Sequence, residues 1–309
     1  MRVVTQQEIG GPEVLHVEEA QTPSPLPSEV LVAVRATGLN PVDAAIRSGG
    51  FPVFGRPPFV LGWDVSGVVT EVVPGVNRFQ VGDEVYGMPL FPRPAGAYAE
   101  FVAAPSRQLA LKPRSIDHVH AGALPLAGLT AWQALVDVAD VQQGQRVLVH
   151  AAGGGVGHLA VQIAKHLGAY VIGTASAGKH EFVRDLGADE VVDYRAVDFT
   201  EAVHDVDVVL ELVGGDYGTR SIEVLRTGGL LVTAVERDNA DLAARTRAAG
   251  RRFAGITVEP DGAGLERLAE LVDAGRLRVH VEHALPLEDA AKAHALLESG
   301  LRGKVVLTI

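Results

Sequence analysis

The chain contains no cysteine, few aromatic residues (5%) and no apolar run of the about 20 residues that a membrane-spanning helix needs. The lack of cysteine excludes disulfides, a thiolate nucleophile and any zinc or iron–sulfur site with cysteine ligands. Positive charge is also scarce, because 27 Lys and Arg face 38 Asp and Glu, for a formal net charge of −11. An acidic chain without a basic run argues against nucleic acid as a partner. These absences predict a soluble, cytoplasmic protein with no membrane partner.

Apolar residues are plentiful, at 47% of the chain. A chain of 309 residues with this composition suits about two domains with buried cores. Before about residue 121, the stretches 29–37 and 66–73 alternate apolar and polar residues as half-buried strands do. Gly and Pro turns separate these stretches, which predicts a barrel-like β domain.

From about residue 121 the pattern changes to strands that alternate with helices. A helix is predicted over 124–138, and strands are predicted near 146–150, 169–173, 190–193, 206–212, 228–235 and 252–258. This alternation is typical of a doubly wound parallel sheet. Helices over 264–274 and 287–298 follow, with strands over 279–285 and 304–309. The α/β chain is therefore predicted to have a discontinuous β domain, residues 1–121 and 259–309, and a nucleotide-binding domain, residues 122–258.

Glycines gather directly after the first strand of the predicted parallel sheet. The apolar strand is followed by Gly153-Gly154-Gly155-Val156-Gly157 and then by a helix-period segment. Glycine is needed where the backbone turns sharply and approaches a pyrophosphate, which the N–H groups of the helix N-terminus then face. We therefore predict that Gly154, Gly155, Val156 and Gly157 hold a dinucleotide pyrophosphate.

The residues after the second strand of this sheet indicate which dinucleotide binds. An NAD site normally presents Asp or Glu there to the ribose 2′-hydroxyl. This chain has Thr174, Ser176 and Lys179 in that segment and no carboxylate before Glu181. A lysine point charge suits a 2′-phosphate, so NADPH is the predicted cofactor. The alternative is that Lys179 is a solvated lysine at a helix start.

Further motifs stand in order along the whole chain. They occupy residues 38–43, 47–49, 62–69, 82–87, 124–135 and 303–307. With an A-x-x-G-x-x-G spacing at Ala151, Gly154 and Gly157, the chain resembles the medium-chain dehydrogenase/reductase superfamily. More narrowly, it resembles the zinc-independent NADPH:quinone oxidoreductase branch. The resemblance implies a GroES-like β-barrel catalytic domain and a Rossmann domain that binds NADPH.

Two positions depart from the zinc-dependent relatives. Those relatives place a cysteine near the position of Asn40 and a histidine where Trp63 stands. Tryptophan does not ligate zinc, so we expect no metal centre and no Lewis-acid activation of an alcohol.

The resemblance also implies roles for residues outside the glycine turn. Ser176, Lys179, Tyr194 and Lys304 would bind the 2′-phosphate and adenosine side of the cofactor, with Thr174 beside them. Thr130, Val213, Gly214 and Val235 would lie near the nicotinamide. Two alternatives stay open at this point. Lys304 is equally consistent with a solvated lysine at a strand edge, and the residues at strand ends are equally consistent with ordinary packing.

The expected substrate pocket is apolar with one amide. Phe51, Trp63 and Phe91 would line it, although each aromatic ring also suits the core of the β domain. Asn40 would be the catalytic donor, because its amide can donate to a carbonyl oxygen on which negative charge develops.

These residues predict hydride transfer from NADPH to a quinone or to an α,β-unsaturated carbonyl compound. One alternative is an enoyl reductase that acts on a dedicated biosynthetic intermediate. Another is a non-catalytic NADPH-binding sensor or structural protein. Relatives in this branch often dimerise through edge strands, so a homodimer is expected, with the apolar strand 229–235 as the candidate edge.

Overall fold

The computed structural model describes residues 1–51 and 53–309 and divides into two compact units. Unit 1 contains Met1–Leu129, Glu259–Gly275 and Val279–Ile309, and unit 2 contains Thr130–Val258 with Arg276–Arg278. The first boundary falls after residue 129, whereas the sequence pattern had placed it after residue 121. The reason is that helix α2 (His118–Ala123) packs on strands β3 (Glu29–Gly38) and β16 (Lys304–Thr308) of unit 1.

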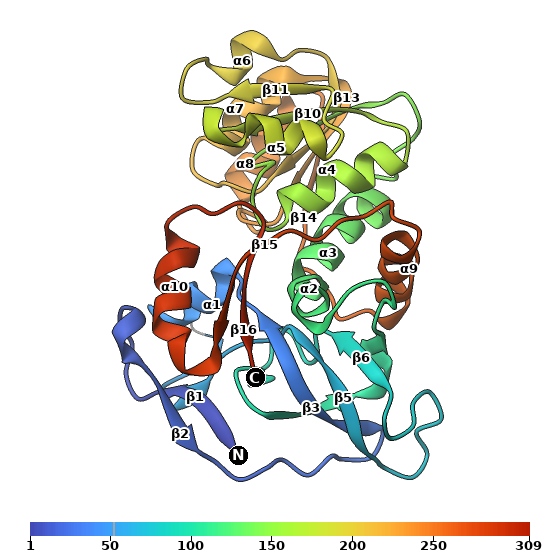
Figure 1. Ribbon diagram of the computed structural model, residues 1–309. Helices are drawn as coiled ribbons and strands as arrows, with labels where there is room; N and C mark the ends of the chain where they lie inside the picture. The colour runs from blue at the N-terminus through green and yellow to red at the C-terminus, as the bar shows by residue number, and fades with distance from the viewer. Residues whose placement is uncertain (52) are drawn as a thin grey trace. The chain divides into compact units, whose positions relative to one another are not determined.

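Unit 1 combines a small sheet with a larger one (Figure 1). The small sheet has the order β2-β1-β4, and the seven-stranded sheet has the order β15-β16-β3-β5-β6-β8, with β7 also paired to β3. Its remaining strands are β1 (Arg2–Gln6), β2 (Leu15–Glu19), β4 (Phe59–Val60), β5 (Val65–Val72), β6 (Glu84–Gly87), β7 (Phe101–Pro105), β8 (Leu109–Leu111) and β15 (Val281–Pro286). Its helices are α1 (Pro41–Arg47), α2, most of α3 (Pro125–Trp132), α9 (Gly262–Asp273) and α10 (Ala290–Glu298).

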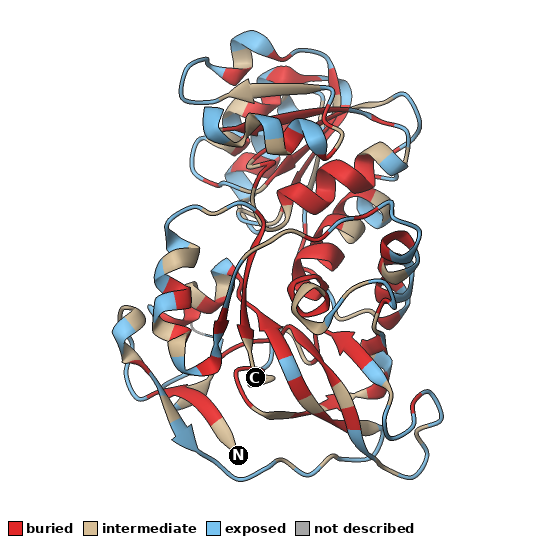
Figure 2. Ribbon diagram, viewed as in Figure 1, coloured by how far each residue is buried: buried red, intermediate tan, exposed pale blue. Residues whose placement is uncertain are grey.

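Strand β3 lies at the centre of unit 1. It pairs antiparallel with β5, β7 and β16, and Val30, Val32 and Val34 are buried in the core. The sequence predicted a half-buried strand there. The strand is instead buried over most of its length (Figure 2), because side chains on both faces of the sheet are covered, on one of them by α2.

Unit 2 is built on a six-stranded sheet in which every strand pair is parallel. Its strands are β9 (Arg146–Val149), β10 (Tyr170–Ala175), β11 (Glu190–Asp193), β12 (Val206–Glu211), β13 (Leu225–Thr233) and β14 (Arg252–Gly255), in the order β11-β10-β9-β12-β13-β14. Its helices are α4 (Gly157–His166), α5 (His180–Asp185), α6 (Phe199–Ala202), α7 (Tyr217–Val224) and α8 (Ala240–Ala248). The strand order reverses at β9, and ligands of such sheets bind at the carboxyl ends of the strands beside this reversal.

The predicted α/β fold class is confirmed, but two details of the prediction are wrong. The helix predicted over 124–138 is two segments, because α3 begins at Pro125 and ends at Trp132, and a π-helical turn, Gln133–Val138, follows it. The segment 229–235 is not an edge strand either. It belongs mostly to β13, which has β12 on one side and β14 on the other.

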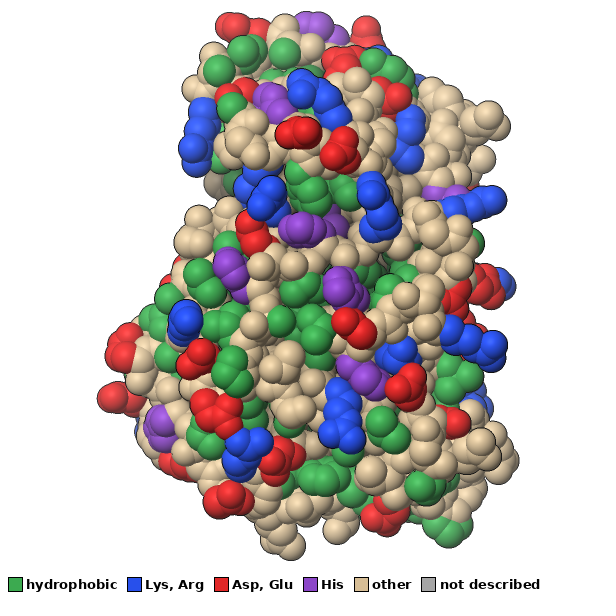
Figure 3. All heavy atoms as spheres, in the orientation of Figure 1, with side chains coloured by type: hydrophobic (Ala, Val, Ile, Leu, Met, Phe, Trp, Pro, Cys, Tyr) green, Lys and Arg blue, Asp and Glu red, His purple; other side chains and the backbone are tan. Residues whose placement is uncertain are grey.

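No helix among the described residues is long and apolar enough to cross a membrane. On the face drawn in Figure 3, basic and acidic side chains are interspersed.

Candidate functional site

The glycine turn of unit 2 connects β9 to α4 and has a tightly constrained backbone. Ala151 adopts a left-handed conformation (φ +50°), and the Gly154 N–H donates to the Ala151 carbonyl oxygen at 2.8 Å. A Cβ on Gly157 would lie 2.2 Å from the same oxygen, which no side chain tolerates. Glycine is therefore required at Gly157, so that helix α4 can begin this close to the preceding strand.

The turn presents backbone donors at the start of α4. Within the described part of the chain, the N–H groups of Gly155, Val156 and Gly157 have no acceptor. Gly155 and Val156 are partly exposed, and α4 continues for ten residues, so its dipole adds positive potential here. Gly154 was expected to donate as well, but its N–H is already used within the turn. The backbone donors that an anion could use are thus the N–H groups of the three residues after Gly154.

A buried histidine, His150, lies directly before this turn and contacts side chains of β10 and α7. His150 Nδ1 lies 3.1 Å from Thr174 Oγ1 and its Nε2 lies 3.0 Å from Ser221 Oγ. Burial, with Arg220 nearby, lowers the pKa of His150 to about 3, so its ring is neutral at pH 7. The Ala151 N–H donates to Thr174 Oγ1 at 3.3 Å. Thr174 was expected to contact the cofactor, but its side chain is buried and instead ties β10 to the turn.

The segment after β10 lies beside the glycine turn. A Cβ on Gly153 would lie 2.9 Å from Cδ of Lys179, so the lysine stem runs along the turn. Ser176 and Lys179 are partly exposed, and Tyr194, after β11, is exposed. The first carboxylate in this segment is Glu181, on α5. An ammonium without a neighbouring acid in its own segment suits a phosphate better than a ribose hydroxyl.

The turns after β12 and β13 are held together by Glu211, a residue that sequence reasoning missed. Its buried carboxylate accepts hydrogen bonds from the N–H groups of Val213 and Gly214, and from Thr233 Oγ1 at 2.9 Å. Thr233 Oγ1 in turn accepts from the Val235 N–H at 3.3 Å. Val213, Gly214 and Val235 therefore lie together at the strand ends, with both valines exposed. Their place beside a nicotinamide stays a prediction. The signal for Glu211 was an acid at the last position of β12, directly after the apolar run Val208-Val209-Leu210.

Thr130 is buried in α3, at the chain position where unit 2 begins. Its predicted place near a nicotinamide stays a prediction.

Unit 1 holds Asn40 in a buried polar cluster at the start of α1. The Asn40 N–H donates to Asp43 Oδ2 at 2.8 Å, which caps the helix. The Asn40 side-chain Nδ2 donates to Asp64 Oδ2 at 2.9 Å, and its Oδ1 accepts from Lys304 Nζ. The other carboxylate oxygen of Asp64 accepts from the Leu126 N–H at the start of α3, at 2.7 Å. Four segments of unit 1 therefore meet at one amide and one carboxylate.

Lys304 does not fit its predicted role at a 2′-phosphate. It belongs to unit 1, its side chain is only 3% exposed, and its ammonium donates to Leu39 O at 2.7 Å as well as to Asn40 Oδ1. It is not the solvated lysine of the alternative either. A buried ammonium whose hydrogens are already committed to protein oxygens is not available to an adenosine phosphate.

Burial shifts the pKa values of the ionisable side chains in this cluster. Burial raises the pKa of Asp64, and the Lys304 charge opposes that rise. Burial lowers the pKa of Lys304, opposed by Asp64 and Asp43. Burial also raises the pKa of Asp43, to about 7, with Asp64 adding to the rise and the Asn40 N–H and Lys304 opposing it. Asp43 therefore titrates near neutral pH.

The aromatic residues predicted to line a pocket form a cluster. Trp63 has no exposed surface, packs edge-on against Phe54 (ring centroids 5.3 Å apart) and Phe91 (4.9 Å), and donates from Nε1 to Arg93 O at 2.9 Å. Trp63 is thus a core residue, which corrects its assignment to the pocket. Phe91 and Phe51 are partly exposed, and their role as pocket residues stays a prediction.

The donor atoms around Asn40 do not suit zinc. The indole of Trp63 is a donor only, and the space between Asn40 Oδ1 and the Asp64 carboxylate is taken by the Lys304 ammonium. Among the described residues, no group of three or more His, Asp or Glu side chains could hold a metal ion.

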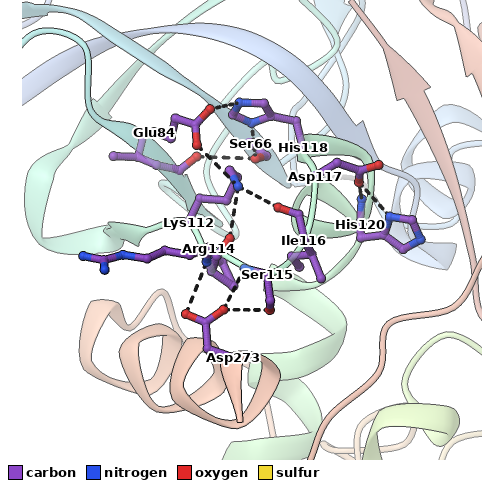
Figure 4. A network of polar contacts seen from close by, with 12 residues as sticks. Ser66, Glu84, Lys112, Arg114, Ser115, Ile116, Asp117, His118, His120 and Asp273 are labelled. Carbon is purple, nitrogen blue, oxygen red and sulfur yellow. Dashed lines mark hydrogen bonds and ion pairs between the residues drawn. The ribbon is translucent and has the colours of Figure 1, made fainter. Parts of the chain in front are cut away.

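A second polar network of unit 1 lies around the start of α2 (Figure 4). His118 Nδ1 lies 2.8 Å from Ser66 Oγ, and His118 Nε2 lies 3.1 Å from Glu84 Oε1. Ser66 is fully buried within β5, so this serine, histidine and carboxylate cannot act as a nucleophilic triad on a substrate. The buried ammonium of Lys112 joins the network at Glu84 and at Ile116 O. The network fastens β5, β6 and α2 together.

Comparisons with known proteins cover the whole chain. An alcohol dehydrogenase GroES-like domain model matches residues 26–114, and a zinc-binding dehydrogenase model matches residues 186–307. The chloroplastic NADPH-dependent alkenal/one oxidoreductase of Arabidopsis thaliana is 34% identical, over 99% of this chain and 79% of that protein. The quinone oxidoreductase of Coxiella burnetii superposes with a TM-score of 0.95 at 37% identity, over 100% of this chain and 99% of the other. The Escherichia coli quinone oxidoreductase complexed with NADPH gives 0.91 at 30% identity, over 100% of both chains.

Proposed function

Because this chain belongs to the medium-chain dehydrogenase/reductase superfamily, among its quinone oxidoreductases and alkenal/one reductases, we propose that it is an NADPH-dependent reductase of quinones or α,β-unsaturated carbonyl compounds. The chain is thus an oxidoreductase. The observation that carries the cofactor assignment is the turn before α4. Among the described residues, the N–H groups of Gly155, Val156 and Gly157 have no acceptor, and Gly157 has no room for a Cβ. The segment of Lys179 after β10 contains no carboxylate before Glu181, which supports a 2′-phosphate and hence NADPH rather than NADH.

The residues of unit 2 would bind and orient this cofactor. The N–H groups of Gly155 to Gly157 would hold its pyrophosphate, and Ser176, Lys179 and Tyr194 its 2′-phosphate and adenosine. Val213, Gly214 and Val235 would lie beside its nicotinamide. When bound, NADPH supplies a hydride, which is the difficult part of the chemistry.

Unit 1 would stabilise the charge that hydride addition creates on the substrate. As the carbon conjugated with the carbonyl gains a hydride, negative charge develops on the carbonyl oxygen. A fixed N–H donor at that oxygen lowers the barrier, and the amide of Asn40 is our candidate donor. A proton from solvent then completes the reduction. No step uses zinc, because the donor set around Asn40 does not suit it.

The test is oxidation of NADPH, followed by its absorbance, on a panel of simple quinones, enones and enoyl thioesters, with NADH in parallel. We expect turnover of at least one quinone or enone with a clear preference for NADPH. Turnover confined to thioesters would favour the dedicated enoyl reductase instead. NADPH binding without turnover of any acceptor would refute the reductase and favour a sensor.

The same panel tests Asn40. Because one donor to a developing oxyanion contributes about 100-fold or more to kcat, Asn40→Ala should lower kcat by about that factor on every substrate accepted. An Asn40→Ala enzyme with unchanged kcat would remove Asn40 from the mechanism and leave the cofactor assignment intact.

We also propose that the chain forms a homodimer through β14. This strand ends the sheet of unit 2, with β13 as its partner on one side and its other edge unpaired among the described strands. An unpaired edge can pair with its own copy around a twofold axis. Light scattering should give a dimer that becomes monomeric when Ala254 is replaced by proline. A monomeric parent chain would refute the proposal. The cytoplasmic location stays a prediction.

A further inference from the structure

The ammonium of Lys304 lies among oxygens from two separate segments of unit 1. It donates to Leu39 O and Asn40 Oδ1, which are neighbours between β3 and α1, and it lies 3.4 Å from Asp64 Oδ2 before β5. Lys304 itself begins β16, some 240 positions from Asp64 in the sequence. Because Lys304 and Asp64 are almost wholly buried, water cannot replace these contacts. Lys304 therefore acts as an internal cation that is bound by an oxygen cage.

This cage fixes the orientation of the Asn40 amide. The amide oxygen faces the Lys304 ammonium, and the amide nitrogen faces the Asp64 carboxylate at 2.9 Å. A flipped amide would place N–H groups against an ammonium and an oxygen against a carboxylate, and both contacts would be repulsive. Charge on both sides thus selects one of the two amide orientations.

The fixed orientation leaves one donor of Asn40 weakly engaged. The nitrogen carries two hydrogens, one of which is bound to Asp64, while the second is 3.5 Å from Gly38 O, the outer limit of a hydrogen bond. A cation at the amide oxygen also draws electron density from the nitrogen, which strengthens the remaining N–H as a donor. We therefore take this second N–H as the candidate donor to a substrate oxygen.

Folding stability alone does not explain a buried ion pair at this position. Two buried charges lose their hydration, and an apolar pair of similar volume is often as stable or more stable. Lys304 and Asp64 are therefore costly unless the charges do something that apolar side chains cannot do.

We propose that Lys304 is a positioning residue for Asn40: with Asp64, it holds the amide in one orientation and leaves a single N–H to donate to the substrate oxygen. The proposal rests on the reductase function and on the role of Asn40 in it. Lys304 acts through Asn40 and needs no contact with the substrate.

The experiment removes the Lys304 ammonium by substitution and then supplies an ammonium from solution. Lys304→Ala should lower kcat about 10- to 100-fold, with the KM for NADPH within about threefold of the parent value, because the lost group orients one transition-state donor. Ethylammonium added to Lys304→Ala should restore a substantial part of kcat, whereas ethanol, which is similar in size but neutral, should not. In the Asn40→Ala/Lys304→Ala double variant, ethylammonium should restore nothing.

Lys112→Ala is the matched control. Lys112 is also a buried lysine of unit 1 whose ammonium binds carbonyl oxygens and a carboxylate, yet Asn40 is not among its partners (Figure 4). Its kcat should stay within about threefold of the parent value and should not respond to ethylammonium. If Lys304→Ala does not fold, Lys304→Met/Asp64→Asn removes both charges at similar volume and should fold with the same loss of kcat.

Three results would overturn the proposal: an unchanged kcat in the folded Lys304 variants, rescue by ethanol as effective as by ethylammonium, or rescue that persists without Asn40. Failure of the reductase function would appear differently, as a parent enzyme that turns over no quinone or enone. The cage can then still be tested by the NMR signal of the Asn40 side-chain amide, assigned by its loss in Asn40→Asp. That signal should shift in Lys304→Ala and stay in place in Lys112→Ala, and an unmoved signal in Lys304→Ala would refute the cage itself.

Discussion

Replacing Asp43 by asparagine should remove a pH dependence from the stability of unit 1. Burial, with Asp64 nearby, raises the pKa of Asp43 from 3.8 to about 7, against the opposing effects of the Asn40 N–H and Lys304. In the unfolded chain this carboxyl titrates near its ordinary value. From about pH 4 to about pH 7, Asp43 is therefore ionised in the unfolded chain but still protonated in the folded chain. The free energy of unfolding thus falls as the pH rises.

The size of the effect follows from the two pKa values. They differ by about three units, and each unit corresponds to about 1.4 kcal/mol, so the parent chain loses about 4 kcal/mol between pH 4 and pH 8 through this group. Asparagine has nearly the same volume, keeps an oxygen for the Asn40 N–H and carries no charge. The free energy of unfolding of Asp43→Asn, relative to the parent, should thus rise by about 4 kcal/mol over that range.

Urea unfolding followed by tryptophan fluorescence measures this difference. Trp63 is buried in unit 1, and a Trp132→Phe background leaves Trp63 as the only tryptophan of the chain. A reporter in one unit matters, because a chain of two units need not unfold in one step. A difference between the two proteins that stays constant from pH 4 to pH 8, or that grows in favour of the parent as the pH rises, would refute the reasoning.

Three further substitutions test unit 2. Gly157→Ala should weaken NADPH binding more than tenfold in a fluorescence titration, because its Cβ would lie 2.2 Å from Ala151 O, whereas Gly178→Ala, with open space around its Cβ, should bind as the parent does. Lys179→Gln should lower the preference for NADPH over NADH in kcat/KM about tenfold, through the loss of one point charge at the phosphate; an unchanged ratio would move the phosphate site elsewhere. Glu211→Gln should raise the Kd for NADPH about tenfold and lower the Tm, because an amide oxygen replaces a carboxylate that orders two turns; unchanged binding would show that these turns do not contact the cofactor.

The fold could be predicted because its signals are local. The parallel sheet follows from the change of period near residue 121, and the tight turn before α4 follows from glycines directly after an apolar strand. The order of strands in a sheet depends on residues far apart in the sequence. The segment 229–235 was therefore predicted as an edge strand, although β14 pairs with its outer side. The periodicity of a strand does not indicate which neighbours cover its edges.

Individual site residues were harder to predict, because their partners are distant in the sequence. A lysine at the start of the last strand reads as a solvated residue, and only the fold brings it to Asp64. Trp63 was predicted to line a pocket, yet its ring packs against Phe54 and Phe91, which no short pattern reveals. Thr174 was predicted to bind the cofactor because of its position in the sequence. Its side chain is instead buried beneath the turn, where it contacts His150.

The two units support the proposed reaction with different kinds of groups, and this difference predicts where the chain tolerates change. Unit 2 offers backbone N–H groups to the cofactor, so its requirements are conformational: glycine at Gly157, and supports such as Glu211 that order the turns. Unit 1 offers one side-chain amide whose orientation depends on the buried charges of Lys304 and Asp64. A conservative change of charge should therefore cost about tenfold in unit 2, as for Lys179→Gln and Glu211→Gln, and up to about 100-fold around Asn40. A change of backbone shape should have the opposite pattern, because a side chain can regain its rotamer after a small backbone shift but a backbone donor cannot.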